Sequence, residues 1–215
     1  MGPSATARFY QLLIENCQKQ GLKNNDEYPY IVIYNLPVPD LIADQNSKEI
    51  TLEMIIAGLK KLESFGADFI VIPCNTIHAY IDTFRKAVTV PIISIVEVTV
   101  ERICAKKIGI LGSKTTMKEG IYQFALEEKG KEIILPENMD RVSDVIKKII
   151  GGEDEKEDEL FLIEEIRKMS RKGAEAVILG CTELPLIVNG ENSPLPVFDT
   201  LSILAECSVK EVCYR

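Results

Sequence analysis

The chain has 215 residues, of which 46% are hydrophobic and 27% are charged, and this composition excludes a disordered or fibrous protein. Its 33 acidic and 25 basic residues give a formal net charge of -8, which does not favour nucleic acid or an anionic membrane as a partner. The apolar runs fall far short of the roughly 20 residues that a membrane span needs. We therefore expect a small-molecule protein of one or two domains.

The hydrophobic pattern predicts that helices and strands alternate along the chain. In chain order, the expected elements are helix 4–20, strand 30–35, helix 48–65, strand 68–73, helix 75–87, strand 91–95, helix 97–105, strand 107–112, helix 115–129, strand 131–135, helix 138–150, helix 158–172, strand 175–180, a short helix after Cys181, strand 196–199 and helix 200–213. This alternation is typical of α/β proteins with parallel sheets that are covered by helices on both faces.

Two segments of the chain are near copies of each other. Residues 66–74 read GADFIVIPC and residues 173–181 read GAEAVILGC, so each has a turn glycine, a short apolar strand and a final cysteine at the same spacing. An amphipathic helix precedes each copy, and a proline-led strand follows it. We predict two pseudo-symmetric domains, each a mostly parallel sheet flanked by helices, formed by residues 1–95 with 200–215 and by residues 96–199.

The alignment of the two halves also predicts a gap in the first one. A strand at 107–112 precedes the helix that contains Tyr122, whereas the matching helix at 4–20 has too little chain before it for a strand. The first strand of the N-terminal half is therefore expected to be missing. Such a strand is normally an inner strand, and burial of about five apolar side chains would be lost with it, at roughly 1.5 to 3 kcal/mol each.

Two cysteines follow the carboxyl ends of the repeated strands, where ligands bind in open α/β sheets. They are Cys74 and Cys181, and each is followed by polar residues, Asn75, Thr76 and Thr182. We expect these residues to begin helices whose free N–H groups face a carboxylate and lower the pKa of the thiols. The duplication predicts that one thiol removes a Cα proton and the other returns a proton to the opposite face.

Other residues near these motifs have more than one interpretation. His78 lies four residues beyond the first cysteine and either tunes that thiol, contacts the substrate or supports the structure. Glu183 lies two residues beyond the second cysteine and either orients a substrate amine and assists the thiol or belongs to a helix start. Thr115 and Thr116 follow the strand at 107–112 and either line the cleft or cap the next helix.

The motifs P-C-N-T at 73–76, G-C-T-E at 180–183 and M-G-P at the N-terminus resemble those of the aspartate/glutamate racemase family, nearest its aspartate racemase branch, over essentially the whole chain. The resemblance implies a cofactor-independent, two-domain α/β enzyme that forms a dimer and uses Cys74 and Cys181 as opposed acid and base. The residues that it assigns to the substrate α-carboxylate are Asn75, Thr76 and Thr182.

Two further positions concern the side chain of the substrate. Aspartate-specific members carry P-D-R after the second strand, where the arginine binds the side-chain carboxylate, whereas Leu41 follows Pro39 and Asp40 here. The bidentate clamp is therefore lost, and the substrate is left open among aspartate, glutamate and related amino acids. Lys156 lies where a basic residue assists distal carboxylate binding in such enzymes, so the resemblance assigns it to the substrate as well.

The sequence thus predicts a homodimeric amino-acid racemase with no metal or other cofactor. The six cysteines contain no C-x-x-C pair, which argues against a structural zinc site. The N-terminus shows no signal-peptide pattern, which indicates a cytoplasmic protein. Two alternatives stay open. One is a related cysteine-dependent isomerase or decarboxylase of small dicarboxylates, and the other is a non-catalytic truncated homologue that binds carboxylates.

Overall fold

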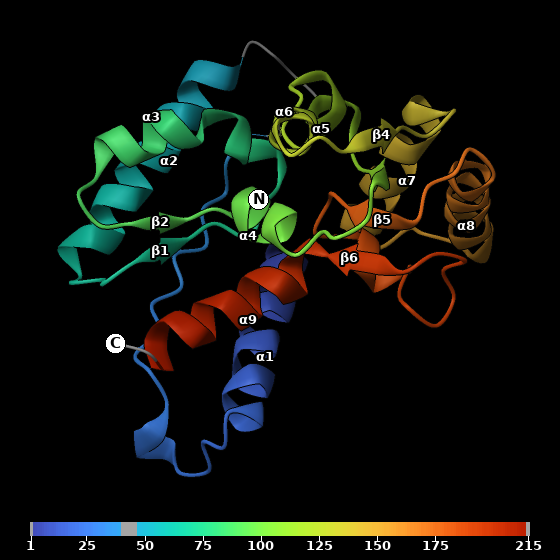
Figure 1. Cartoon of the computed structure of the whole chain (residues 1–215). Helices are drawn as coiled ribbons and strands as arrows, with labels where there is room; N and C mark the ends of the chain where they lie inside the picture. The colour runs from blue at the N-terminus through green and yellow to red at the C-terminus, as the bar shows by residue number, and fades with distance from the viewer. Residues whose placement is uncertain (1, 40–46, 214–215) are drawn as a thin grey trace.

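The computed structural model describes residues 2–39 and 47–213, and its strands form two parallel sheets flanked by helices (Figure 1). The smaller sheet pairs β1 (Ile70–Val71) with β2 (Ile92–Ile93). The larger sheet has the order β4-β3-β5-β6, and its strands are β3 (Lys107–Leu111), β4 (Glu132–Ile134), β5 (Ala176–Leu179) and β6 (Val197–Asp199). The predicted α/β fold class is confirmed.

Helices connect these strands. In the described residues they are α1 (Pro3–Lys19), α2 (Lys48–Ser64), α3 (Ile81–Ala87), α4 (Ile95–Glu101), α5 (Lys114–Lys118), α6 (Gln123–Glu128), α7 (Met139–Gly151), α8 (Lys156–Arg171) and α9 (Thr200–Cys213), with the 3-10 helices η1 (Asn25–Glu27), η3 (Thr76–Tyr80) and η4 (Leu184–Leu186). Within this part of the chain, no helix is both long and apolar enough to span a bilayer.

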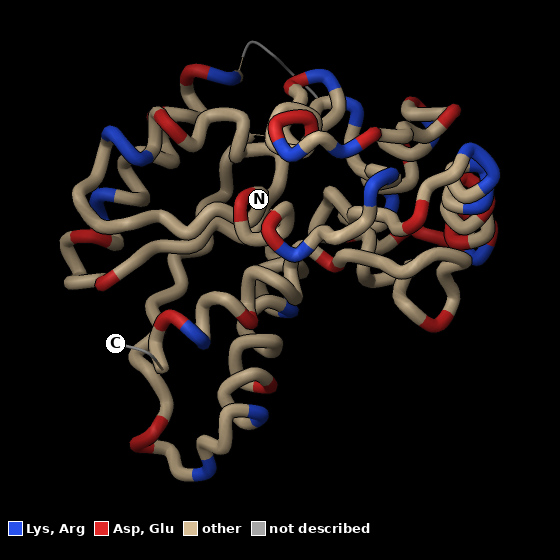
Figure 2. Tube along the Cα trace, in the orientation of Figure 1, with Lys and Arg blue, Asp and Glu red and all other residues tan. Residues whose placement is uncertain are grey.

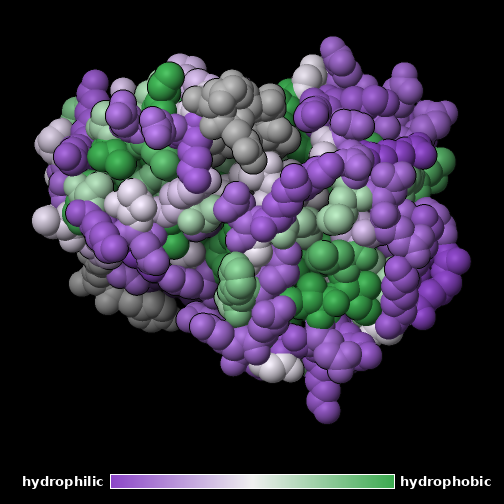
Figure 3. Space-filling view, turned by 90° about the horizontal axis from the view of Figure 1, so that it is seen from above, coloured by the Kyte–Doolittle hydropathy of each residue, from purple (hydrophilic) through white to green (hydrophobic). Residues whose placement is uncertain are grey.

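Charged side chains lie mainly on the outer helices and turns. Lys and Arg alternate there with Asp and Glu, and the strands of both sheets carry few charges (Figure 2). The face seen from above is mostly hydrophilic, with hydrophobic residues in separate groups (Figure 3). The apolar residues of the strands are therefore in the interior, and both β3 and β5 are almost entirely buried.

The repeated segments fold into the same unit in both halves. In the first unit, Val71 of β1 pairs with Ile93 of β2. In the second, Ile178 of β5 pairs with Phe198 of β6, so the register relative to the following cysteine and to the strand-leading proline is identical. Both turn glycines before the strands have a positive φ, 82° at Gly66 and 95° at Gly173, a conformation that a residue with a Cβ adopts only with strain.

Helix α9 connects the C-terminal end of the larger sheet back to the first half. It packs against α1 and α4, and it lies beside both in Figure 1. Leu204 of α9 shares one buried cluster with Phe9 of α1 and Ile108 of β3. The two halves therefore have a continuous apolar contact. The proposed domain boundaries at residues 95 and 199 stay a prediction.

The strand predicted at 30–35 is wrong. Residues 29–39 have no regular secondary structure, and no backbone hydrogen bond joins residues 30–35 to another described segment. Several of its apolar side chains are exposed, including Val32 and Ile33. A strand forms only where a neighbouring strand pairs with its N–H and C=O groups, and among the described residues no strand lies next to residues 30–35 in this way.

Three predicted helices are shorter or divided. The helix expected at 75–87 is η3 followed by α3, and the helix expected at 115–129 is α5 followed by α6. Gly120 lies between α5 and α6 with a φ of 63°, and this left-handed residue interrupts the helix. The helix expected at 97–105 is α4, which begins two residues earlier and ends at Glu101.

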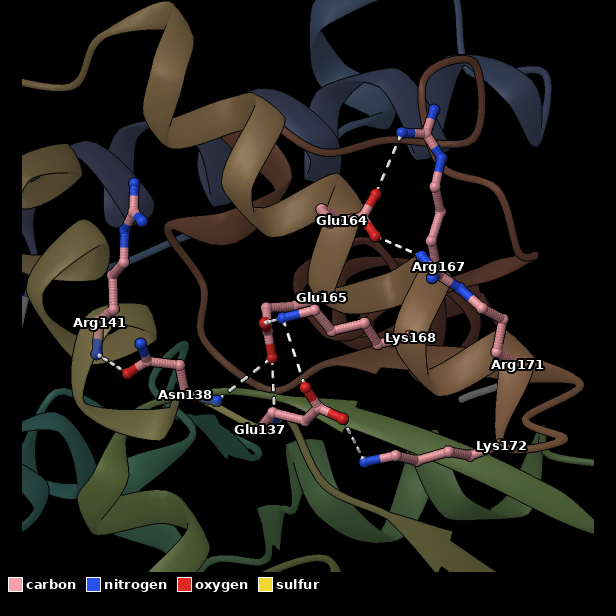
Figure 4. A network of polar contacts seen from close by, with 9 residues as sticks. All are labelled: Glu137, Asn138, Arg141, Glu164, Glu165, Arg167, Lys168, Arg171 and Lys172. Atoms are coloured by element: carbon pink, nitrogen blue, oxygen red, sulfur yellow. Dashed lines mark hydrogen bonds and ion pairs between the residues drawn. The ribbon is translucent and has the colours of Figure 1, made fainter.

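A buried carboxylate joins α8 to the chain that leads into α7. Glu165 is fully buried, and its Oε2 accepts hydrogen bonds from the backbone N–H groups of Glu137 (2.7 Å) and Asn138 (3.3 Å). Lys168 donates to its Oε1 at 2.6 Å, and Figure 4 shows these groups converging between the two segments. Glu165 therefore satisfies two N–H groups that have no strand or helix partner.

We expect Glu165→Ala to destabilise the protein strongly, because it leaves two backbone donors without their acceptor. Each unsatisfied buried donor costs about 1–3 kcal/mol. The free energy of unfolding, measured with urea, should fall by roughly 2–6 kcal/mol. The control is Glu164→Ala, which removes only surface ion pairs with Arg167 and Arg171. The same urea midpoint for both variants would contradict the role of Glu165 as a buried hydrogen-bond acceptor.

Candidate active site

The two repeated units bring Cys74 and Cys181 into one electrostatic environment. Cys74 follows β1 and is half-buried, and Cys181 follows β5 and is buried. The pKa of the Cys181 thiol is raised well above its usual value by burial, then by the Glu183 carboxylate, and also by the charge of Cys74. Burial and Glu183 raise the pKa of Cys74 as well. The charge of Cys74 therefore acts on Cys181, and both thiols have Glu183 as a neighbouring carboxylate.

The direction of these pKa shifts differs from the one expected from the sequence. The backbone N–H groups of Thr76 and Ile77 do bond to the Cys74 sulfur and lower its pKa, as expected for a helix start. They are outweighed by the removal of the thiolate from water and by the negative charge of Glu183. The expected net lowering of the thiol pKa is therefore wrong for this structure.

Glu183 accepts hydrogen bonds from the two residues before it, Cys181 and Thr182. Its Oε2 accepts hydrogen bonds from the Cys181 thiol at 3.1 Å and from the Thr182 hydroxyl at 3.0 Å. Its other oxygen, Oε1, faces Gly2, where an added Cβ would clash with it. Gly2 is the N-cap of α1, so the positive end of that helix dipole lies against the buried carboxylate. A side chain at position 2 would therefore have to displace the Glu183 carboxylate.

Asn75 is held between the two halves by a buried chain of polar groups. Its Nδ2 donates to the Thr200 hydroxyl at 3.1 Å, and its Oδ1 accepts a hydrogen bond from the Tyr122 hydroxyl. Thr200 in turn donates to the carbonyl of Leu179 at 3.0 Å. Tyr122 is fully buried, and burial raises the pKa of its phenol far above the usual value, so it stays a neutral donor. The second N–H of Asn75 Nδ2 is left for another acceptor.

Three buried hydroxyl groups form a second contact between the halves. Thr76 Oγ1 lies 3.1 Å from Thr116 Oγ1 and 3.5 Å from Ser113 Oγ, and the last two atoms are 3.0 Å apart. Ser113 also caps α5 by accepting the N–H of Thr116 at 3.1 Å. Thr115 lies half-buried in the same first turn. The structure thus brings together Thr76 of η3, which follows β1, and Thr116 of α5, which follows β3.

His78 uses both ring nitrogens inside the protein. Its Nδ1 lies 2.8 Å from the carbonyl oxygen of Cys74, and its Nε2 accepts the N–H of Ile95 at 3.3 Å. A carbonyl only accepts, so Nδ1 carries the proton. Burial lowers the pKa of His78 to about 4, and the ring is neutral at ordinary pH. His78 therefore fixes the backbone at Cys74 to the start of α4.

Lys156, a predicted substrate position, is not part of this group. Lys156 is the first residue of α8, which lies at the outer edge of the molecule in Figure 1. Its side chain is 69% exposed and forms an ion pair with Glu159 at 2.7 Å. Leu41 lies outside the described residues. Neither position gives structural information on the side chain of a substrate.

Sequence reasoning missed two residues of the buried polar chain, Tyr122 and Thr200. Tyr122 lies 47 residues from Asn75, and Thr200 lies 125 residues from it. The hydroxyl of a tyrosine or a threonine carries no local sign of such a distant partner. Ser113 carried a visible signal, because a serine before a helix is a common N-cap.

The geometry places two thiols, one carboxylate and several hydroxyl and amide donors at the carboxyl ends of parallel strands. Thiols and carboxylates transfer protons, and fixed N–H and O–H donors stabilise negative charge on oxygen. The described residues contain no group of three His, Cys, Asp or Glu side chains placed to hold a metal ion. The arrangement is suited to proton transfer at a carbon atom next to a carboxylate.

Comparison with known proteins gives a consistent result. The family model described as Asp/Glu/Hydantoin racemase matches residues 1–207. The broad specificity amino-acid racemase RacX of Bacillus subtilis is 32% identical over 212 residues, which cover 97% of this chain and 93% of RacX.

Two solved structures are similar over nearly their whole length. An aspartate racemase homologue from Pyrococcus horikoshii has a TM-score of 0.81 and 29% identity, and the alignment covers 99% of this chain and 95% of that one. A putative Asp/Glu racemase from Yersinia pestis has a TM-score of 0.83 and 26% identity, with 98% and 94% covered. The chain therefore belongs to the Asp/Glu/hydantoin racemase family, as its motifs predicted, and is an amino-acid racemase.

Proposed function

We propose that the protein racemises an amino acid without a cofactor, with Cys74 and Cys181 as opposed acid and base. The observation that carries this proposal is the position of each cysteine at the same point of the two repeated units, within electrostatic reach of the other. A two-base racemase needs one proton carrier on each face of the Cα atom. The pseudo-symmetry of the two units supports that arrangement.

The proton transfers follow from the groups around each sulfur. A thiolate at one cysteine takes the Cα proton and becomes a thiol, and the electron pair of the broken C–H bond moves onto the carboxylate. The thiol on the opposite face then protonates the carbon and becomes a thiolate. Glu183, which accepts the hydrogen bond of the Cys181 thiol, is placed to take that proton before the reaction.

The raised thiol pKa values require a source of positive charge when the thiolate forms. The α-ammonium group of an amino acid brings this charge into the site, and an opposite charge nearby favours the ionised form of a thiol. Binding of the substrate therefore activates the base. The α-carboxylate is held by Asn75, Thr76 and Thr182, and the same donors stabilise the charge that develops on its oxygens.

Glu183, Thr115 and Thr116 complete the proposed substrate site, whereas Lys156 remains assigned by resemblance alone. The substrate is aspartate, glutamate or a related amino acid. The absence of the family arginine at Leu41 and the similarity to RacX, a broad specificity amino-acid racemase, both favour more than one substrate. A homodimer in the cytoplasm stays a prediction.

The two-base proposal predicts a distinct isotope pattern. In heavy water, an L-amino acid should give a D-product that carries deuterium at Cα, while the early remaining L-substrate stays unlabelled. Cys74→Ser and Cys181→Ser should each reduce kcat/KM for racemisation by about 10²–10⁴-fold. Cys104→Ser, at an exposed position, is the control. Activity that survives both substitutions, or carbon dioxide release in place of racemisation, would sink the proposal.

The charge of Glu183 gives a second prediction. Because this carboxylate raises the pKa of both thiols, Glu183→Gln should lower both values. Alkylation of Cys74 and Cys181 by iodoacetamide, followed by mass spectrometry, should then begin at a lower pH than in the parent. Glu191→Gln is the control, because Glu191 lies in an exposed turn, and it should not change the pH dependence of alkylation. A profile that stays unchanged or moves to higher pH in Glu183→Gln contradicts the electrostatic account.

Tyr122 acts by positioning Asn75, and its loss should weaken substrate binding. Tyr122→Phe leaves a buried amide oxygen without its donor, so we expect a stability loss of about 1–3 kcal/mol. We also expect KM to rise several-fold more than kcat falls, because a misplaced Asn75 weakens binding of the carboxylate before the proton moves. Tyr10→Phe is the matched control, since Tyr10 is its exposed counterpart in the first half. An unchanged KM would rule out this role.

A further inference from the structure

The turns that follow Cys74 and Cys181 differ in the donor that each cysteine carbonyl uses. At a helix start, such a carbonyl ordinarily accepts the N–H of the residue three or four positions further along the chain. The carbonyl of Cys181 does so, because the N–H of Leu184 donates to it at 3.2 Å. The carbonyl of Cys74 instead lies 2.8 Å from Nδ1 of His78, and no backbone N–H of the described residues donates to it.

This difference leaves one more backbone N–H free in the first half. Ile77 corresponds to Leu184 in the repeat, since each lies three residues beyond its cysteine. The N–H of Leu184 is used by a carbonyl, whereas the N–H of Ile77 bonds to the Cys74 sulfur and lowers the pKa of that thiol. The N–H of Thr76 acts on the same sulfur in the same direction. Two backbone donors therefore favour the thiolate of Cys74.

Among the described residues, the second half supplies only one such donor. The N–H of Glu183 is the backbone group that lowers the pKa of Cys181, and the carboxylate of the same residue raises it. Pro185 lies where His78 lies in the first half, four residues beyond the cysteine. Proline has neither an imidazole nor a backbone N–H. The repeat thus contains its own comparison, in which the half with the histidine has the extra N–H at its sulfur.

The imidazole of His78 is held as a donor to the Cys74 carbonyl. Its Nε2 accepts the N–H of Ile95 at 3.3 Å, so the proton of the neutral ring is on Nδ1. Burial lowers the pKa of the ring to about 4. The charged residues that act on the ring are Arg85 and Glu97, which have opposite effects on its pKa and form an ion pair with each other at 2.7 Å. The ring is therefore neutral and fixed in orientation at ordinary pH.

We propose that His78 is a positioning residue for Cys74, because its imidazole occupies the Cys74 carbonyl and leaves the N–H of Ile77 to stabilise the thiolate. A hydrogen bond to the charged form of a group favours that form. The second half lacks this device, and its Cys181 thiol donates a hydrogen bond to the Glu183 carboxylate. Cys74 is therefore the cysteine that ionises first. This inference rests on the proposed function, in which Cys74 is one of the two bases.

Two substitutions separate this role from general support of the structure. His78→Leu removes both ring nitrogens and keeps a buried apolar side chain. His78→Asn keeps an N–H donor near the position of Nδ1 but loses the acceptor for the N–H of Ile95. Alkylation of Cys74 and Cys181 by iodoacetamide is followed against pH by mass spectrometry in the parent and in both variants. The loss of the Ile95 contact is common to both variants, so it cannot produce a difference between them.

His78→Leu should move the alkylation profile of Cys74 to higher pH by about one unit or more, as expected for the loss of a hydrogen bond to a charged group. The N–H of Ile77 then returns to the carbonyl, as that of Leu184 does in the second half. The profile of Cys181 should not move, and His78→Asn should restore most of the Cys74 profile. Equal shifts in the two variants, equal shifts of the two cysteines, or no shift at all would overturn the proposal.

The parent protein allows a second test, which holds even where a variant does not fold. His78 is the only histidine of the chain, so nuclear magnetic resonance of histidine labelled with a heavy nitrogen isotope gives the signals of this ring alone. We expect a neutral ring with its proton on Nδ1, which gains a second proton only as the pH approaches about 4. A proton on Nε2, or titration near the ordinary value of about 6.5, overturns the proposal. Neither test requires turnover, so a parent without racemase activity would remove the proposed function and leave both results valid.

Discussion

Parallel pairing in one register is the constraint on which the site depends. β1 with β2 and β5 with β6 have the same alignment relative to the cysteine that follows, so both sulfur atoms leave their sheets at equivalent points. The carboxyl ends of parallel strands are also where neighbouring loops converge. A one-residue slip in either pair would turn every strand side chain to the opposite face and move one cysteine away from the other.

The halves are joined around this site by buried polar contacts as well as by apolar packing. Tyr122, Asn75 and Thr200 form one such contact, and Thr76 with Thr116 forms another. A buried polar group is costly unless it has a partner, so each of these contacts ties the position of one half to that of the other. The same donors that align the halves are those proposed to hold a carboxylate. Stability and substrate binding therefore depend on shared residues.

Much of the fold was predictable because the repeat is local. The spacing from Gly66 to Cys74 and from Gly173 to Cys181 predicted two equivalent strand and cysteine units, and the glycines have the positive φ that this role implies. The strand at 30–35 was not predicted correctly, because its apolar pattern is right for a strand but pairing depends on a neighbour that the pattern does not supply. The direction of the thiol pKa shifts was missed for a similar reason. A helix start is visible in the sequence, whereas the burial of Cys181 and its contact with Glu183 depend on tertiary structure.

The central claim is that Cys74 and Cys181 face one small molecule from opposite sides. The most direct test is to crosslink the folded protein with a short reagent that carries two thiol-alkylating groups. The linked peptides are identified by mass spectrometry. The account predicts one reagent molecule joined to Cys74 and Cys181, and loss of this crosslink when a substrate amino acid is present. Single modification of each cysteine without a crosslink, or a crosslink that substrate does not suppress, would contradict it.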